Sequence, residues 1–200
     1  MSNNNNNNNG FFSTFGSGGG SGGGGSTSGK GIHALAVASG NRLTPFIVWG
    51  NTDTITLDKT AMVVFPFYPA NDFTAIRFRF EVTTAVASST ASVVMYDDLA
   101  GKPNNKIYES SAVSTATTGI KTILISENFS KGTTYYIGVY SGSAVGIKSV
   151  PRGATYSLGF SNTLNGLFNG YTGVASFGIP DQFGTATDYV GSLPYVDIAL

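Results

Sequence analysis

Two adjacent carboxylates, Asp97 and Asp98, are the first candidates for chemistry in this sequence, with Gly101 in the turn that follows them. A hard cation such as calcium takes several oxygen ligands, often from one tight turn. Two carboxylates are too few for such a site, and the acid-rich pattern of a dedicated calcium loop is absent. We therefore expect both aspartates to accept backbone hydrogen bonds in a turn between strands.

The other carboxylates do not form a recognisable catalytic pair. Glycoside hydrolysis needs two carboxyl groups that face each other across a cleft, about 5–10 Å apart. No spacing argues for such a pair among the remaining acidic residues, which are Asp53, Asp58, Asp72, Glu81, Glu109, Glu127, Asp181, Asp188 and Asp197.

His33 is the only histidine, and the chain has no cysteine. These counts exclude a histidine cluster, thiolate metal ligands and a cysteine nucleophile. His33 also directly follows a flexible stretch, so nothing would hold it in a productive geometry. No Gly-x-Ser-x-Gly nucleophile elbow, with a strand before it and a helix after it, accompanies His33. We expect no enzyme activity, no cofactor and no metal site.

Four aromatic residues could form a platform for sugar rings at one end of a β-sandwich. They are Trp49, Tyr68, Tyr171 and Tyr189. Aromatic residues in a domain of this size also fill cores and interfaces. Both interpretations stay open, and binding of a host-surface glycan is the alternative to the main hypothesis below.

The N-terminus is expected to be an anchoring arm. An asparagine tract at residues 3–9 precedes Phe11, Phe12 and Phe15, and a glycine–serine stretch follows at residues 16–29. Ordering such a chain costs about 1–2 kcal/mol per residue, so it cannot fold alone. Three phenylalanines buried on a partner would contribute about 1.5–3 kcal/mol each before ordering costs. A disordered tail that merely carries aromatic residues is the alternative.

We divide the chain into this arm, residues 1–31, and one domain, residues 32–200, which is long enough for a core of its own. Charged residues make up 11% of the chain, against about 25% in a typical soluble domain. Eleven basic residues balance eleven acidic ones, so no net field draws nucleic acid or anionic membranes. Weak surface charge protects poorly against self-association, and we expect a homo-oligomer.

Targeting signals are not evident. The N-terminus lacks the basic and apolar regions of a secretory signal peptide. No apolar run approaches the roughly 18 residues of a membrane-spanning helix. We therefore expect synthesis in a cytoplasm and no membrane span.

Residues 76–82 give the clearest strand signal. Ile76, Phe78, Phe80 and Val82 alternate with charged residues, which predicts a half-buried strand with these four side chains on the buried face. Further strands are predicted at residues 61–67, 92–96, 106–111, 119–126, 133–140 and 195–200, and no long segment has apolar residues at helical spacing. The fold class that follows is all-β: an antiparallel, jelly-roll-like β-sandwich preceded by a low-complexity N-terminal extension.

Residues 153–191 are glycine-rich and hold seven aromatic residues. The stretch is too apolar for a disordered loop and too interrupted for long strands. We expect it to cover one edge or end of the sandwich and to contribute an oligomer contact.

Several segments, in the order in which they occur, resemble a known module. They read FTAIRFRFEVTT at residues 73–84, VVMYDDLAGKPNNKIYES at 93–110, STATTGIKTILIS at 114–126, TTYYIGVYS at 133–141 and PYVDIAL at 194–200. The order is similar to that of a β-sandwich module in structural proteins of tailed bacteriophages, namely tail-fibre, tail-tip and other accessory virion proteins. Asn104 departs from the pattern, which usually has a second glycine there.

The resemblance implies a non-catalytic structural component of a tailed-phage virion, attached through its N-terminal arm. Its partners would be other virion structural proteins and further copies of itself. Its location would be the virion, after synthesis in the host cytoplasm. A host-surface glycan-binding adhesin is the alternative, and a tail-borne hydrolase is a more distant one.

Overall fold

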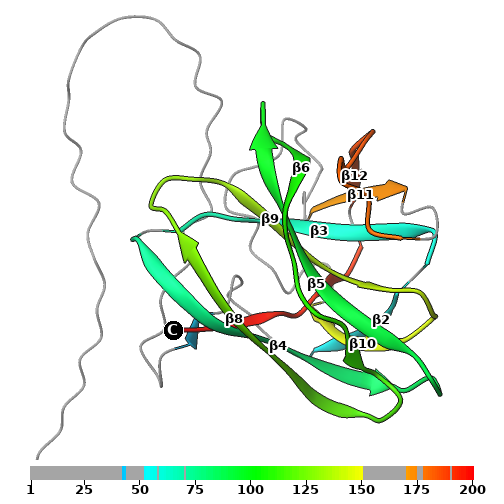
Figure 1. Ribbon diagram of the computed structural model, residues 1–200. Coiled ribbons are helices and arrows are strands. Elements are labelled where there is room, and N and C mark those ends of the chain that lie inside the picture. The colour runs from blue at the N-terminus through cyan, green and yellow to red at the C-terminus, as the bar shows by residue number, and fades with distance from the viewer. Residues whose placement is uncertain are drawn as a thin grey trace, which may run out of the picture.

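In the computed structural model, the described residues form two antiparallel β-sheets that pack face to face (Figure 1). These residues are 42–43, 52–57, 59–69, 71–150, 170–174, 178–189 and 191–200. No helix occurs among them. The all-β, antiparallel sandwich predicted from the sequence is therefore confirmed.

The first sheet, here called the β4 sheet, is built around its longest strand. Its strands lie in the order β1 (Arg42–Leu43), β14 (Asp197–Ala199), β4 (Phe73–Thr84), β10 (Gly146–Val150) and β13 (Leu193–Pro194). Two more strands join it, because β2 (Asp53–Thr56) pairs with β10 and β8 (Gly119–Phe129) pairs with β4.

The second sheet, here called the β9 sheet, packs against the first. Its order is β12 (Thr187–Tyr189), β11 (Gly170–Val174), β3 (Ala61–Phe67), β9 (Tyr135–Ser141), β5 (Thr90–Leu99) and β6 (Lys102–Glu109), with β7 (Val113–Ser114) also paired to β5. The chain crosses repeatedly between the two sheets, since β3, β5 and β9 alternate along the sequence with β4, β8 and β10. Strands that lie side by side are therefore often distant in sequence.

The core lies between the two sheets and consists of apolar side chains at alternate strand positions. Phe78 and Phe80 of β4 are buried in one cluster with Phe65 of β3 and Ile137 of β9. Ring-to-ring contacts with centroids 4.9 to 6.2 Å apart also join the sheets. They involve one residue each from β3, β4, β8 and β9, which are Phe67, Phe73, Phe129 and Tyr135.

Ile76 is not on the buried face of β4, so this part of the strand prediction is wrong. Its side chain is 45% exposed, whereas Ala75 and Phe78 are buried. The register between β4 and β8 shifts between Ala75 and Arg77. A β-bulge of this kind breaks strict alternation, which turns Ile76 outward while the later apolar residues of β4 keep the predicted side.

The predicted strands occur close to their expected bounds, and the largest difference has a local cause. Strand β3 begins and ends as predicted. Strand β6 begins earlier than predicted because the β5–β6 hairpin closes with only Ala100 and Gly101, at φ of 55° and 84°. Two residues at positive φ match the twist of the paired strands. The tight turn places Pro103 inside β6 rather than in a loop.

Part of the glycine-rich region covers the sandwich, as expected. Strands β11 and β12 form one side of the β9 sheet, and Ile179 and Phe183 pack onto an outer face of the same sheet. Residues 153–169, 175–177 and 190 lie outside the described residues. An oligomer contact in this region stays a prediction.

Gly138 offers a test of the packing within the β9 sheet. It pairs with Val64 of β3 and Val94 of β5. An added Cβ atom would lie 2.7 Å from the backbone oxygen of Val63 and 2.9 Å from Val64 Cγ1. We predict that Gly138→Ala lowers the free energy of unfolding by about 1–3 kcal/mol, because the neighbouring strand must shift to admit the methyl group. Urea denaturation followed by circular dichroism measures this change.

Gly142→Ala is the matched control. Gly142 is exposed, and an added Cβ atom would meet nothing within 4 Å. The substitution should change the free energy of unfolding by less than about 0.5 kcal/mol. Equal destabilisation by the two substitutions would contradict the steric explanation.

Candidate functional site

The outer face of the β9 sheet, opposite the core, carries a second apolar cluster. Residues from β3, β5 and β9 form it at the positions that alternate with core residues, and they are Met62, Val64, Val94, Tyr96 and Tyr136. Phe183 completes the cluster, and its ring meets the ring of Tyr96 edge-on with centroids 5.1 Å apart. We call residues 178–186 the covering segment, since Ile179 and Ala186 also pack there.

Backbone hydrogen bonds fasten the covering segment to the edge of β6. The amide of Lys106 donates to the carbonyl of Asp181 at 2.7 Å, and the amide of Phe183 donates to the carbonyl of Asn104 at 2.8 Å. Between these two hydrogen bonds, Gln182 and Asn105 form an isolated antiparallel β-bridge. The covering segment therefore caps an edge of the β9 sheet as well as its face.

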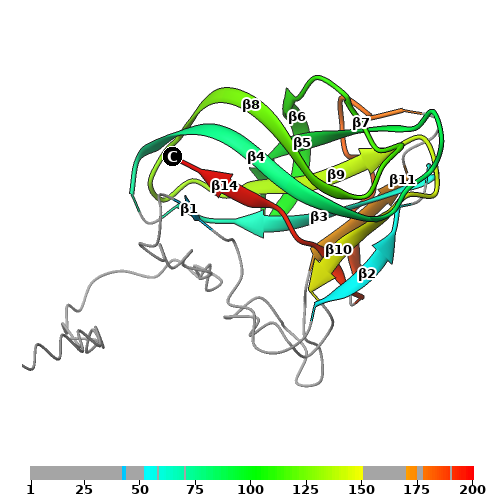
Figure 2. The same ribbon diagram turned by 90° about the horizontal axis from the view of Figure 1, so that it is seen from below.

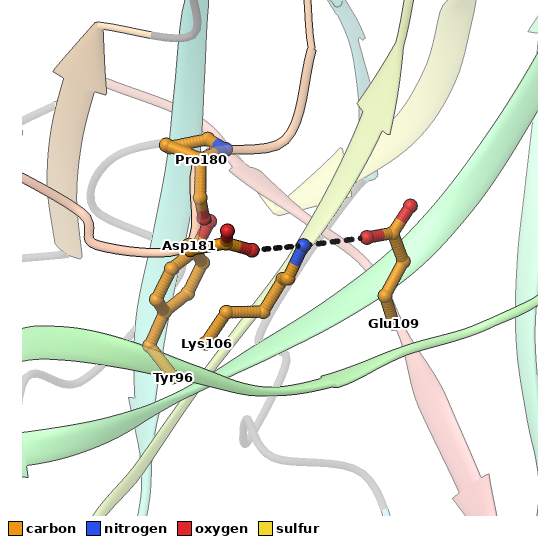
Figure 3. Close-up of polar contacts among 5 residues, drawn as sticks. All are labelled: Tyr96, Lys106, Glu109, Pro180 and Asp181. Carbon is orange, nitrogen blue, oxygen red and sulfur yellow. Dashed lines mark hydrogen bonds and ion pairs between the residues drawn. The ribbon is translucent and has the colours of Figure 1, made fainter.

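Lys106 lies between two carboxylates at this edge (Figure 3). Its Nζ atom is 2.9 Å from Glu109 Oε2 and 2.9 Å from Asp181 Oδ1. Hydrogen bonds to Asp181 and Glu109 raise the pKa of Lys106, although partial burial opposes the shift. The Asp181 carboxylate is 93% exposed, so this ion pair contributes little stability, about 0–1 kcal/mol.

Tyr96 holds the covering segment from below. Its ring is buried, and its hydroxyl donates a 2.9 Å hydrogen bond to the carbonyl of Pro180 (Figure 3). Burial raises the pKa of this hydroxyl, and the carboxylates of Glu109 and Asp181 raise it further. The phenol therefore stays protonated and serves as a hydrogen-bond donor.

The protons that Lys106 and Tyr96 retain limit the reactions that this cluster could support. A protonated lysine and a protonated phenol are poor bases and poor nucleophiles at neutral pH. Of the acidic residues considered for a catalytic pair, Glu109 and Asp181 do come together, but the Lys106 ammonium lies between them (Figure 3). The arrangement holds a segment in place.

A second polar site lies on the outer face of the β4 sheet, around a groove of about 180 Å³. Arg79 Nε donates to Asp197 Oδ1 at 3.1 Å, and Arg79 Nη2 donates to Asp197 Oδ2, which joins β4 to β14. Lys148 Nζ donates to Glu81 Oε2 at 2.9 Å and joins β10 to β4. Tyr195 also lines the groove. Since each of these charges has a partner, the groove suits a neutral polar ligand better than an ion.

The adjacent aspartates Asp97 and Asp98 have different roles. Asp97 Oδ1 accepts a hydrogen bond from the backbone amide of Asn105 at 2.6 Å, across the β5–β6 hairpin, so a backbone hydrogen bond occurs as predicted. Asp98 Oδ1 instead accepts a 3.0 Å hydrogen bond from the Tyr136 hydroxyl, which the sequence did not indicate. Both carboxylates contribute to the fold around the hairpin.

The proposed aromatic platform is only partly described. Tyr189 is half-buried and packs against the core, and burial raises the pKa of its hydroxyl. Tyr68 is half-buried just beyond the end of β3. Tyr171 pairs with Val64 through its backbone, whereas Trp49 lies outside the described residues. A glycan platform stays a prediction.

The arm, residues 1–31, with Phe11, Phe12 and Phe15, also lies outside the described residues. Within the described ranges, no three histidine, aspartate or glutamate side chains gather in a way that could hold a metal ion. The same part of the chain contains no helix with the length and apolarity of a membrane span.

The cluster around Lys106 was not predicted from the sequence. Asp181 stands in the sequence only as one of several acidic residues without a pairing partner, and nothing in the local pattern links it to β6. The available signal was the run of aromatic residues in the glycine-rich region, which indicated a cover without saying which face it covers.

Neither the models of known protein families nor the curated proteins give a match to this chain.

The pKa of Tyr96 leads to a prediction on alkaline stability. The folded state holds the phenolic proton more tightly than the unfolded chain, so this stabilisation is complete below about pH 10 and is lost as the pH rises through the folded pKa. We predict that Tyr96→Phe lowers the free energy of unfolding at pH 7 by about 0.5–1.5 kcal/mol, through loss of the hydrogen bond to Pro180. Between about pH 10 and 12, the variant should lose stability less steeply than the wild type.

Urea denaturation at each pH measures both effects. A residual slope is expected in the variant, because the pKa values of Lys106, Tyr108 and Tyr189 are also raised. Parallel curves for wild type and variant above pH 10 would contradict the role of the Tyr96 proton.

Proposed function

We propose that the chain is a non-catalytic structural component of a tailed-phage virion, in a tail fibre, a tail tip or another accessory position. The segments that resemble phage virion modules support this, because they coincide with β4, the β5–β6 hairpin, β7 to β8, β9 and β14. The resemblance therefore rests on the framework of the sandwich rather than on connecting loops.

The observation that carries the proposal is that the two polar clusters described above, around Lys106 and around Arg79, are engaged in contacts within the sandwich. Lys106 is shared by two carboxylates, and the Tyr96 hydroxyl is bound to a carbonyl. Arg79 and Lys148 each pair with a carboxylate on a neighbouring strand. In contrast, large aliphatic side chains are exposed on β8. Such a surface suits contact with other proteins better than a reaction.

Attachment is assigned to the arm. Phe11, Phe12 and Phe15 would supply the apolar contact, and the glycine–serine stretch at residues 16–29 gives an average reach of about 20 Å. Many copies on one particle would raise the effective concentration, so a weak contact for each copy would suffice.

Removal of residues 1–31 should leave a folded domain that no longer joins the particle. Full-length and truncated chains are added to virions that lack the protein, and bound protein is quantified after sedimentation. We expect binding of the truncated chain to fall at least about tenfold, because the buried phenylalanines and the avidity of the arm are lost together. Unchanged incorporation would contradict the anchoring role.

Two full-length variants distinguish the apolar contact of the three phenylalanines from the reach of the glycine–serine stretch. Replacing Phe11, Phe12 and Phe15 with serine keeps the length of the arm and should reproduce the loss. Rearranging the order of glycine and serine within residues 16–29 should leave incorporation unchanged. Retention of the full chain on host-surface glycans, lost on Tyr68→Ala, would instead favour the adhesin alternative.

A further inference from the structure

Strand β8 lies at an edge of the β4 sheet. It pairs with β4 from Phe73↔Phe129 to Val82↔Gly119, and among the described residues no strand pairs with its other side. Figure 2 shows β8 as the outermost strand there, with β4 between it and β14. An edge strand presents unpaired amide and carbonyl groups and is a ready template for another strand.

Strand β8 exposes two large aliphatic side chains, Ile120 and Leu124. Even-numbered residues face outward and odd-numbered residues face the interior, as the alternation of exposure shows. Leu124 is 81% exposed and Ile120 is 66% exposed, whereas Ile123 is buried. Large exposed aliphatic residues on a free edge are typical of a contact surface.

The charges on β8 are placed symmetrically about its centre. Lys121 and Glu127 are the only charged residues of the strand, and each stands three positions from Leu124. Two antiparallel copies of β8 that cross at Leu124 would therefore set Lys121 of each copy opposite Glu127 of the other. Cross-strand pairs of opposite charge stabilise a sheet, whereas like charges destabilise it.

We propose that β8 is a dimerisation edge that pairs antiparallel with β8 of a second copy of this chain, about a two-fold axis at Leu124. In this register Thr122 faces Ser126 of the other copy and Leu124 faces its own equivalent. Each residue meets one of the same parity, so outward side chains meet outward ones and the β4 sheet continues across the dimer. The inference goes beyond the proposed function, since it requires neither the arm nor a particle.

A second copy fits this edge better than the chain's own arm does. Residues 1–31 contain one charged residue, Lys30, and no carboxylate that could face Lys121. In the structure Lys121 donates to the exposed Thr117 hydroxyl at 2.8 Å, a neutral contact that a carboxylate can replace. A contact about a two-fold axis also uses the β8 edge of each copy and leaves neither edge free, so it yields a closed dimer rather than a fibre.

The expected dimer is weak. One pair of edge strands buries less surface than a standard interface, so we expect a dissociation constant of about 10–100 µM. A bulge at the register shift between Ala75 and Arg77, beside Leu124 of β8, would add local twist and limit the length of the paired stretch. Copies held together on an assembly would exceed this concentration locally.

Cysteine substitutions in the full-length chain test the register, because the chain has no native cysteine. Leu124→Cys should give a disulfide-linked dimer under mild oxidation, since directly opposed residues lie within bonding reach. Ser126→Cys alone is the matched control. It is equally outward on β8, but its own copy would lie about 13 Å away. A mixture of Thr122→Cys and Ser126→Cys chains should cross-link, whereas neither chain should do so alone.

Charge substitutions test the same contact without a covalent bond. Sedimentation equilibrium of the full-length chain should show that Lys121→Glu and Glu127→Lys each weaken dimerisation at least about tenfold, because both ion pairs become repulsive. The double variant restores opposite charges and should dimerise within about threefold of the wild type. Urea denaturation of each variant shows whether a loss of dimer reflects a loss of folding.

The outcomes divide clearly. Cross-linking confined to Leu124 and to the mixed pair, together with rescue by the double charge variant, supports the proposal. A chain that is monomeric at 500 µM (about fivefold above the weakest expected constant) overturns it. So does cross-linking of Ser126→Cys alone that equals Leu124→Cys, or dimerisation insensitive to both charge reversals, because these results place the contact elsewhere. None of these results depends on incorporation into particles, so failure here and failure of the anchoring role are distinguishable.

Discussion

The central strands of the β9 sheet carry apolar side chains on both faces, and the need to cover both faces shapes the rest of the sandwich. Phe65 and Ile137 point to the β4 sheet, while their sequence neighbours Val64 and Tyr136 belong to the cluster on the opposite face. Leaving either face in water would cost about 25 cal/mol per Å² of apolar surface. The β4 sheet covers one face and the covering segment covers the other. The polar contacts around Lys106 follow from this need, since they fasten the second cover at its edge.

Alternation of apolar residues predicts the long strands well because it depends only on neighbours in the sequence. It misplaces Ile76 because a bulge depends on the register of the partner strand, which local sequence does not contain. Strand β10 escapes prediction because Lys148 and Ser149 interrupt its apolar pattern, although β2, β4 and β13 all pair with it. A cover could be foreseen from the aromatic residues of the stretch 153–191, but the attachment of the covering segment to Lys106 could not, since the partners lie far apart in the chain. Whether a charged residue lies on the outside of a strand, and which distant residue it contacts, are properties of the folded structure.

A surface with so few charges would recognise a partner only at short range. The formal net charge is zero, and the ion pairs Arg79–Asp197 and Lys148–Glu81 join strands within the sandwich. Little long-range field remains to steer an encounter. Shape, aliphatic side chains and strand edges act only on contact, so a protein of this type depends on being brought close to its partner. In the proposed function the arm would supply proximity, and the sandwich would supply orientation.

In the sequence, the covering segment comes long after the strands whose outer face it covers. This order has a consequence for folding. Strands β3, β5 and β9 are complete by Ser141, whereas the covering segment begins at residue 178. The pair Arg79–Asp197, which holds β14 on β4, spans 118 residues. Contacts so distant form only after long loops have closed, which slows folding. Until then the outer face of the β9 sheet is open to other chains, and exposed apolar strands are prone to aggregation. The same few residues that complete the native surface therefore also set how long the chain remains vulnerable while it is being made.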